Sequence, residues 1–174
     1  MRVIKLRQWL ELYREPFADL HADQRVMADL GGPFGREESY LKFNRYRDAW
    51  EVDGISRWAV VDEHENFQGY AGVKKAGGPG HPLGTHYEIG WRFRRDVWGQ
   101  GYATTSAKQA LDLAWATIKE DKIFSYTAQD NLRSQAVMAR LNLQRDRERD
   151  FTARYSMGDW TGLVWRADRP SEII

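Results

Sequence analysis

Cysteine is absent from the 174 residues of this sequence, and its absence excludes several kinds of site. Without thiols the chain has no disulfide framework, no thiolate metal centre and no cysteine nucleophile. The four histidines do not replace them, because His81 and His86 are separated by loop residues and no carboxylate pair completes a ligand set. We therefore expect no bound metal.

Long apolar runs and a charge excess of one sign are also lacking. Charged residues interrupt the N-terminal segment before it reaches the length of a signal-peptide core, and no segment approaches the roughly 20 apolar residues that span a bilayer. The 26 Lys and Arg residues nearly balance the 25 Asp and Glu residues, so no global field attracts nucleic acid or an anionic membrane. We expect a soluble, unprocessed, cytoplasmic protein that recognises a small molecule or a local peptide segment.

Material for a core, by contrast, is abundant. Hydrophobic residues make up 42% of the sequence and include eight Trp, eight Tyr and seven Phe, so disorder is not expected. A chain of this length can form a stable core without disulfides or a structural metal ion. No repeat, low-complexity tract or linker divides the sequence, and we expect one domain over residues 1–174.

Hydrophobic spacing in the first half predicts two helices followed by a hairpin. Leu12, Phe17 and Leu20 recur at roughly helical spacing, and Pro16 is tolerated in the first turn of that helix. An aromatic stripe on the second helix belongs to the core or, alternatively, shapes an amine pocket: Tyr40, Phe43, Tyr46 and Trp50. The elements expected here are a strand at residues 2–8, helices at 11–23 and 36–52, and strands at 56–62 and 66–74.

The second half begins after residues 76–85, a loop rich in glycine and proline that could border the substrate entrance. Asp130 is the expected N-cap of the last helix. The mixed charges of residues 145–150 indicate a solvated surface or, alternatively, a face for a peptide or a second subunit. The elements expected here are strands at 86–93, 122–127, 143–151 and 163–167 and helices at 101–118 and 131–141.

Two glycines mark the most informative segment, Trp98-Gly-Gln-Gly-Tyr-Ala-Thr104. They stand at the beginning of a predicted helix, where unpaired backbone N–H groups and the helix dipole hold an anion such as a diphosphate. A plain strand-to-helix turn is the alternative on local grounds. A Rossmann fingerprint and a P-loop are both absent, because neither a third glycine nor a Gly-Lys-Ser/Thr sequence follows at the required spacing.

Around this loop the sequence resembles the GNAT N-acetyltransferase superfamily. The acyl-CoA loop of that superfamily follows the pattern Gln/Arg-x-x-Gly-x-Gly/Ala, and here Gly101 and Ala103 match its small positions while Trp98 stands at its first position. The segments Tyr-Glu-Ile-Gly-Trp and Trp-Gly-x-Gly-Tyr-Ala-Thr look like the branch that includes the ribosomal-protein N-terminal acetyltransferases. The resemblance covers nearly the whole chain, because it extends to Val26-Met27, Gly31-Gly-Pro33 and Asp130-Asn-x-x-Ser134 through Met138 and Leu141.

The resemblance implies a mixed α/β fold in which a mostly antiparallel sheet contains a splayed pair of parallel strands and is flanked by helices. It also implies acetyl-CoA as co-substrate, with its diphosphate on the N–H groups of residues 99–104. Arg94 or Arg95 would meet the adenosine phosphate or be solvated, and Asn131 would bind the pantetheine arm or act as a second cap. The cofactor-binding residues implied are Trp91, Arg92, Phe93, Arg94, Trp98, Gly99, Gln100, Gly101, Tyr102, Ala103, Thr104 and Asn131.

The same resemblance implies two catalytic residues. Acetyl transfer from a thioester to an amine needs an acceptor for the amine proton and a donor for the departing thiolate. Glu88 is the candidate base, acting through water, and a solvent-facing strand glutamate is the alternative. Many superfamily members have a tyrosine acid where this chain has Met138, and in the ribosomal-protein type Ser134 would replace it, unless that serine makes only a local backbone bond. Tyr126 is an alternative acid or a packing aromatic.

The sequence therefore predicts transfer of an acetyl group from acetyl-CoA to a primary amine, either a peptide N-terminus or a small amine. A non-catalytic acyl-CoA-binding module is the alternative, because it would keep the glycine loop without needing Glu88 or Ser134. An interaction domain without a cofactor would require the long resemblance to be coincidental. The motifs do not encode the identity of the amine, and only the resemblance suggests a homodimer.

Overall fold

The computed structural model describes residues 3–155 and 158–171, and its strands form one mixed sheet. The strand order is β1-β2-β3-β4-β5-β8-β6, and β7 pairs with β8 outside this path. All described pairs are antiparallel except β4 with β5, which confirms the mixed α/β fold with one parallel pair. The strands are β1 (Lys5–Arg7), β2 (Arg57–Val61), β3 (Phe67–Ala76), β4 (His86–Phe93), β5 (Lys122–Thr127), β6 (Gln144–Arg145), β7 (Phe151–Tyr155) and β8 (Gly158–Asp168).

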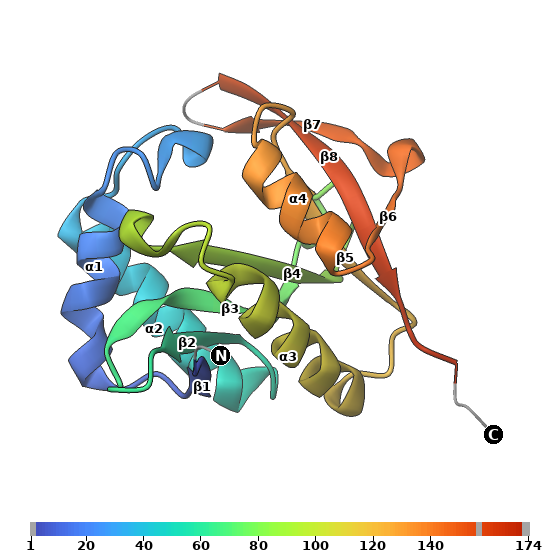
Figure 1. Ribbon diagram of the computed structural model, residues 1–174. Coiled ribbons are helices and arrows are strands. Elements are labelled where there is room, and N and C mark those ends of the chain that lie inside the picture. Colours follow the sequence, from blue (N-terminus) through green and yellow to red (C-terminus); the bar gives the residue numbers. More distant parts are fainter. Residues whose placement is uncertain (1–2, 156–157, 172–174) are drawn as a thin grey trace.

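Helices cover both faces of this sheet (Figure 1). Side chains of a strand alternate between the faces, so Ile89 and Phe93 of β4 pack with Leu111 of the third helix, whereas Tyr70 of β3 packs with residues of the first two helices, such as Phe43. The described helices are α1 (Arg14–Ala22), α2 (Arg36–Val52), α3 (Tyr102–Thr117) and α4 (Leu132–Arg140). Met138 of α4 joins the same cluster as α3, which places these two helices on one face.

An aromatic cluster holds α1 and α2 against the sheet. The ring of Trp9 lies edge-on to Phe17 and Phe43, each at a centroid distance of 5.3 Å, and its indole Nε1 donates to the carbonyl of Arg57 at 2.7 Å. Edge-to-face pairs of this kind add to the free energy gained by burying the rings. The second helix therefore uses Phe43 and Tyr46 for the core, as expected from its aromatic stripe.

The first helix begins later than expected and buries a different residue. A 3₁₀ turn occupies Glu11–Tyr13, α1 begins at Arg14, and Pro16 lies in its first turn as predicted. Leu12 was expected on the apolar stripe but is 64% exposed, while Tyr13 is 2% exposed and packs in the aromatic cluster. Tyr13, Phe17 and Leu20 follow the i, i+4, i+7 spacing of one helical face, whereas Leu12 stands five positions before Phe17, which explains the error.

The C-terminal third differs most from the expectation. The strand expected at 143–151 is broken, because β6 ends at Arg145 and a 3₁₀ turn follows at Arg147–Arg149. The Asp146 carboxylate stabilises this break by accepting from Arg149 at 2.8 Å and from Arg166 at 3.3 Å. The strand expected at 163–167 is part of the longer β8.

The strand expected at residues 2–8 is the shorter β1, and residue 2 of the expected range lies outside the described residues.

The residue that caps α4 also differs from the expectation. The Asn131 side chain, and not Asp130, caps this helix, since its Oδ1 accepts from the backbone N–H of Ser134 at 3.2 Å. Asparagine in this position satisfies one of the unpaired N–H groups of the first turn.

The aromatic cluster gives a direct test of the fold. Replacing the fully buried Phe17 by Ala should lower the free energy of unfolding by about 3–5 kcal/mol, because the cavity left among Trp9, Phe43 and Tyr70 cannot close. Replacing the exposed Leu12 by Ala should change it by about 0.5 kcal/mol or less. Urea unfolding of both variants measures the difference, and equal losses would contradict the placement of these side chains.

Candidate functional site

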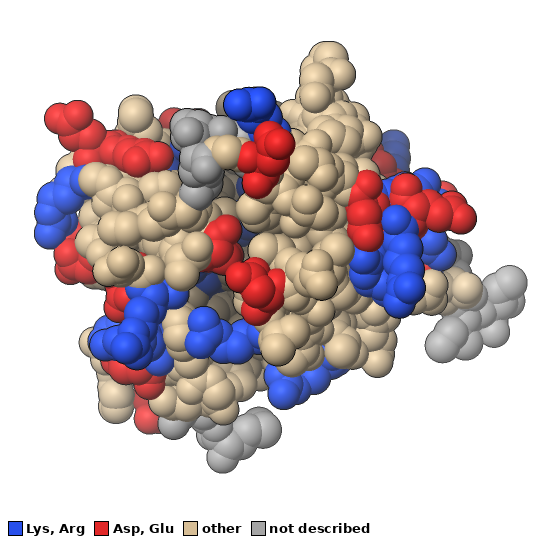
Figure 2. Space-filling model, turned by 90° about the horizontal axis from the view of Figure 1, so that it is seen from above, with Lys and Arg blue, Asp and Glu red and all other residues tan. Residues whose placement is uncertain are grey.

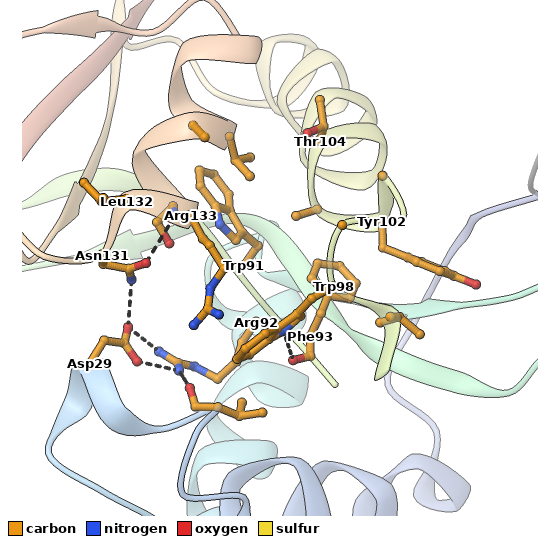
Figure 3. Close-up of a pocket in the computed structure, with 18 of the residues that line it drawn as sticks. Asp29, Trp91, Arg92, Phe93, Trp98, Tyr102, Thr104, Asn131, Leu132 and Arg133 are labelled. Carbon is orange, nitrogen blue, oxygen red and sulfur yellow. Dashed lines mark hydrogen bonds and ion pairs between the residues drawn. The ribbon is translucent and has the colours of Figure 1, made fainter. Parts of the chain in front are cut away.

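A cavity of about 920 Å³ lies where β4 and β5 separate, a volume typical of small-molecule sites. Five segments form its walls: the end of β4, the loop after it, the first turn of α3, one side of α4 along its length, and the chain around Asp29 (Figure 3). The predicted site residues that line it are Trp91, Arg92, Phe93, Trp98, Gly99, Gly101, Tyr102, Ala103, Thr104, Asn131 and Ser134.

The cavity exists because the parallel pair opens after a single point of contact. β4 and β5 are in register only at Glu88 and Phe124, whereas β4 stays paired to β3 from His86 to Phe93. Beyond Glu88, the edge of β4 that faces β5 therefore has backbone N–H and C=O groups without a strand partner among the described residues. Such groups need hydrogen bonds when they are buried, and an elongated polar ligand can supply them.

The glycine loop leads into the uncapped N-terminus of α3 at one end of this cavity. Gly99 and Gly101 have φ of 74° and 84°, in the left-handed region that favours glycine. Gly101 is the N-cap of α3, so no side chain caps the helix, and the first turn of α3 contains no acidic residue. The unpaired N–H groups and the positive end of the helix dipole are therefore available to a negatively charged group.

Asp29 closes the opposite wall of the cavity. Its carboxylate accepts from the two terminal nitrogens of Arg92 at 2.8 and 3.1 Å, and the amide of Asn131 approaches it at 3.5 Å (Figure 3). Arg92 also donates to the carbonyl of Val26. Three segments that lie far apart in the sequence, around residues 26–29, 92 and 131, are thus held together beside the cavity.

Trp98 and Arg133 meet on the side of the glycine loop. The indole Nε1 of Trp98 donates to the carbonyl of Phe93 at 2.9 Å, which fixes the ring. The guanidinium carbon of Arg133 lies 3.7 Å from the centroid of that ring, which is the distance of a cation–π contact. This contact links α4 to the loop across the cavity.

Glu88 lies at the point where the strands part, but it does not line the cavity. Its side chain is 17% exposed and pairs with Arg57 at 3.0 Å and with Lys74 at 3.2 Å. Arg57 is itself buried and also donates to the Glu88 carbonyl at 2.8 Å. A Cβ at Gly90 would lie 2.7 Å from the Arg57 guanidinium, so glycine leaves the room that this arginine occupies.

The two cations determine the protonation of Glu88. Burial would raise the pKa of its carboxyl, but the charges of Arg57 and Lys74 outweigh this desolvation and lower the pKa to about 2. Glu88 is therefore a carboxylate at neutral pH. A nearby phenol responds to the same cations: desolvation opposes ionisation of Tyr46, yet Lys42, Arg57 and Lys74 lower its pKa to about 8.

The candidate acids differ in their access to the cavity. Ser134 lines it, and no group among the described residues pairs with its hydroxyl, in contrast to the Ser106 hydroxyl, which donates to the Tyr102 carbonyl at 2.6 Å. Met138 is 1% exposed and packs in the core. Tyr126 lies among aromatic rings, with Phe151 at a centroid distance of 5.3 Å.

Three predicted residues lie away from the cavity walls. Arg94 is exposed and pairs with Asp96 at 2.7 Å, and Gln100 donates to the Asp96 carbonyl at 2.7 Å. Glu88 is on the face of β4 opposite Trp91 and Phe93, because residues of a strand alternate between faces. The structure thus groups the loop, the end of β4 and α4 around one cavity and places the candidate base behind it.

Sequence reasoning missed the partners that hold these residues. Arg57 is separated from Glu88 by 31 positions and Asp29 from Arg92 by 63. Arg133 stands at an unspecified position of the Asp130-Asn-x-x-Ser134 motif. The sequence held only an indirect signal for Asp29, since this residue lies in the stretch beginning at Val26 that resembles the family.

Charges of both signs are interspersed over the face shown in Figure 2, which agrees with the net charge of +1. Within the residues that the structure describes, no helix is long and apolar enough to cross a membrane. The same residues contain no group of three or more His, Asp or Glu side chains placed to hold a metal ion.

Comparison with known proteins agrees with this geometry. Residues 4–144 match the family described as the acetyltransferase (GNAT) domain. Among solved structures, an acetyltransferase from Agrobacterium tumefaciens strain C58 is similar with a TM-score of 0.77 and 24% identity, over 95% of this chain and 90% of that chain. At this identity, the likeness concerns the fold.

Two further similar structures are of enzymes named for their substrates. The spermidine N-acetyltransferase from Vibrio cholerae, in complex with CoA and spermine, has a TM-score of 0.73 and 15% identity, over 95% of each chain. The ribosomal-protein-S5-alanine acetyltransferase from Vibrio fischeri has a TM-score of 0.69 and 12% identity, over 95% of this chain and 92% of that chain.

The ion trio of Glu88, Arg57 and Lys74 predicts an acid-dependent stability. A lowered pKa means that the ionised carboxylate stabilises the fold fully above about pH 4.5 and that this contribution is lost as the pH falls towards about 2. Glu88→Gln should therefore lower the free energy of unfolding by about 3 kcal/mol at pH 7, because it leaves the buried Arg57 guanidinium without its carboxylate partner, and by less at pH 3.

Urea unfolding of the protein and of this variant between pH 3 and pH 7 measures the effect. Glu51→Gln, at an exposed position of α2, is the matched control and should show almost no cost at either pH. A cost for Glu88→Gln that is the same at pH 3 and pH 7 would contradict the lowered pKa.

Proposed function

The chain belongs to the GNAT acetyltransferase family, and on that premise we propose that it transfers the acetyl group of acetyl-CoA to a primary amine. The observation that supports this proposal most is the cavity of about 920 Å³ between the separated strands, which reaches the uncapped N-terminus of α3. The CoA-bound relative supports the same co-substrate.

The lining of the cavity fits an elongated ligand with an apolar part and an anionic part. The backbone of Trp91, Arg92 and Phe93 would bind the pantetheine arm, and the N–H groups of residues 99–104 would hold the diphosphate. Asn131 would share its amide between this arm and Asp29. Acetyl-CoA supplies the activated acetyl thioester, and the protein supplies the orientation.

The position of Glu88 supports an approach of the amine from the face of α1 and α2. Glu88 is on that face of β4, whereas Trp91 and Phe93 are on the face of α3. A carboxylate with a pKa of about 2 is too weak a base to deprotonate a free ammonium, so Glu88 would take up, through a bound water molecule, the proton that the nitrogen loses once it has attacked the thioester. The acceptor would therefore react in its neutral form.

Ser134 is the group proposed to donate a proton to the thiolate. It lies on the cavity wall, one turn after the Asn131 cap, and its hydroxyl has no other partner among the described residues. The Asn131 bond to its backbone N–H fixes the residue. Met138 cannot take this role, because a thioether has no proton to donate.

Two classes of acceptor amine fit this site. Glu88-Ile-Gly-Trp91 and Ser134 favour the ribosomal-protein branch and therefore a peptide N-terminus. A small amine is the second choice, because the fold is at least as similar to that of a polyamine enzyme as to that of a ribosomal-protein enzyme. Either acceptor agrees with the expected cytoplasmic location.

A non-catalytic acyl-CoA-binding module is the competing function. The burial of Met138 at the position of the usual acid favours it, since this side chain is 1% exposed and belongs to the core. Such a module would bind acetyl-CoA but would not need Ser134. The two functions therefore predict different effects of a change at Ser134.

Binding of acetyl-CoA is the first testable consequence. At about 100 times its dissociation constant, acetyl-CoA should raise the free energy of unfolding by roughly 2.7 kcal/mol, because it binds the folded state alone. A thermal shift assay measures this, with ATP as the control for non-specific phosphate binding. If millimolar acetyl-CoA produces no shift, both the enzyme and the binding module are excluded.

Turnover separates the remaining two functions. Ser134→Ala should lower kcat by about 100-fold, with acetyl-CoA affinity unchanged, because the thiolate loses its proton donor. Thr117→Ala is the matched control, since its exposed hydroxyl on α3 bonds to the Leu113 carbonyl and to no other group in the described part of the chain. Thiol release with a panel of amines and peptides measures the rate, and an unchanged kcat would remove Ser134 from the mechanism.

A further inference from the structure

The glycine loop presents no side-chain cation to the anion site that it forms. Trp98 stands at its first position, and the only hydrogen-bond donor of this side chain is already bonded to the Phe93 carbonyl at 2.9 Å. The ring therefore offers its face to the surroundings. Backbone N–H groups and a helix dipole then carry the whole attraction for an anion, unless a cation reaches the loop from another element.

Arg133 reaches the loop from α4. It is the second residue of that helix, and its side chain extends into the cavity towards Trp98 (Figure 3). The distance of 3.7 Å from its guanidinium carbon to the ring centroid is the shortest of the cation–ring distances described. Stacking occupies the face of a guanidinium and leaves its N–H groups, which point outward in its plane, free to donate.

The charge of Arg133 is also uncompensated in the described part of the chain. Arg92 pairs with Asp29 and Arg94 pairs with Asp96, whereas no described carboxylate lies within ion-pair distance of Arg133. Because Asp29 neutralises Arg92, the second guanidinium is tolerated beside it. The group of Asp29, Arg92 and Arg133 carries a net charge of +1 at the wall of the cavity.

Two other arginines line the cavity, but nothing holds their side chains in place. Arg25 and Arg140 have no ion pair and no ring contact among the described residues. A cation that is already fixed loses less conformational entropy when it binds an anion. Arg133 is thus the one of these three whose position is set before a ligand arrives.

We propose that Arg133, stacked on Trp98, is the cation that binds the diphosphate of CoA at the glycine loop. Trp98 is a positioning residue in this arrangement, because it acts through the arginine. The inference rests on the proposed function, adds Arg133, which neither the sequence motif nor the family pattern assigns, and gives Trp98 the task of positioning it. It also explains how a positive charge reaches the ligand at a loop whose first residue is a tryptophan, because Arg133 of α4 supplies that charge.

Binding measured by calorimetry tests the charge. Arg133→Ala should weaken acetyl-CoA and dephospho-acetyl-CoA by the same factor, about 10- to 100-fold, because both ligands carry the diphosphate. Arg140→Ala is the matched control, with the same residue type, helix and cavity, and its effect should be several-fold smaller. Equal losses in the two variants would overturn the proposal, and so would a loss confined to acetyl-CoA, which would assign Arg133 to the 3′-phosphate.

A double-mutant cycle tests the stacking. Trp98→Leu should weaken acetyl-CoA in the presence of Arg133 but should add little to the loss in the Arg133→Ala background, because the ring would then have no cation to position. Arg133→Lys should recover only part of the affinity, since an ammonium keeps the charge without the planar fork. Fully additive losses would show that Trp98 acts independently of Arg133 and would refute its positioning role.

The outcomes are separable from those for the proposed function. If acetyl-CoA fails to bind the unaltered protein, the function is wrong. If it binds that protein and the Arg133→Ala variant equally, only the role of Arg133 is wrong. Arg133 is exposed, so its removal leaves the folded core intact, and the unfolding temperature without ligand verifies this.

Discussion

The parting of two parallel strands is the constraint on which the rest of the molecule depends. β4 and β5 share one register point, Glu88 with Phe124, and then diverge. The divergence leaves backbone polar groups of β4 without β5 partners among the described residues and makes room for the cavity. The walls of the cavity then come from elements on both sides of the gap, which explains why residues near 29, 98 and 133 meet there.

Polar contacts between distant segments keep this gap in shape. Asp29 joins the chain after α1 to β4 and approaches α4, and Trp98 joins the glycine loop to α4 through Arg133. Behind the gap, Arg57 of β2 and Lys74 of β3 hold the Glu88 side chain. Buried ion pairs of this kind add little to the free energy of unfolding, because desolvation of the charges offsets their attraction. They fix one geometry, since any other arrangement would leave a buried charge without a partner.

The sequence predicted the elements with strong periodicity and failed where contacts between distant residues decide. The second helix and strands β4 and β5 were predicted at their observed bounds, and the glycines at 99 and 101 have the positive φ expected of a loop that opens a helix. The break after Arg145 was missed, because it depends on the bonds of Asp146 to Arg149 and Arg166. The surroundings of Glu88 were missed for the same reason, since no local pattern places Arg57 beside it.

Gly90 has a consequence that concerns volume rather than backbone conformation. Any side chain at this position would enter the space of the Arg57 guanidinium, 2.7 Å from the new Cβ. Positions 57 and 90 therefore share one fixed space across β3, and a larger residue at one requires a smaller residue at the other. In relatives of this chain, Arg at position 57 together with Gly at position 90 would identify members that carry the buried guanidinium. A larger residue at position 90 would identify members in which other groups hold the glutamate at position 88.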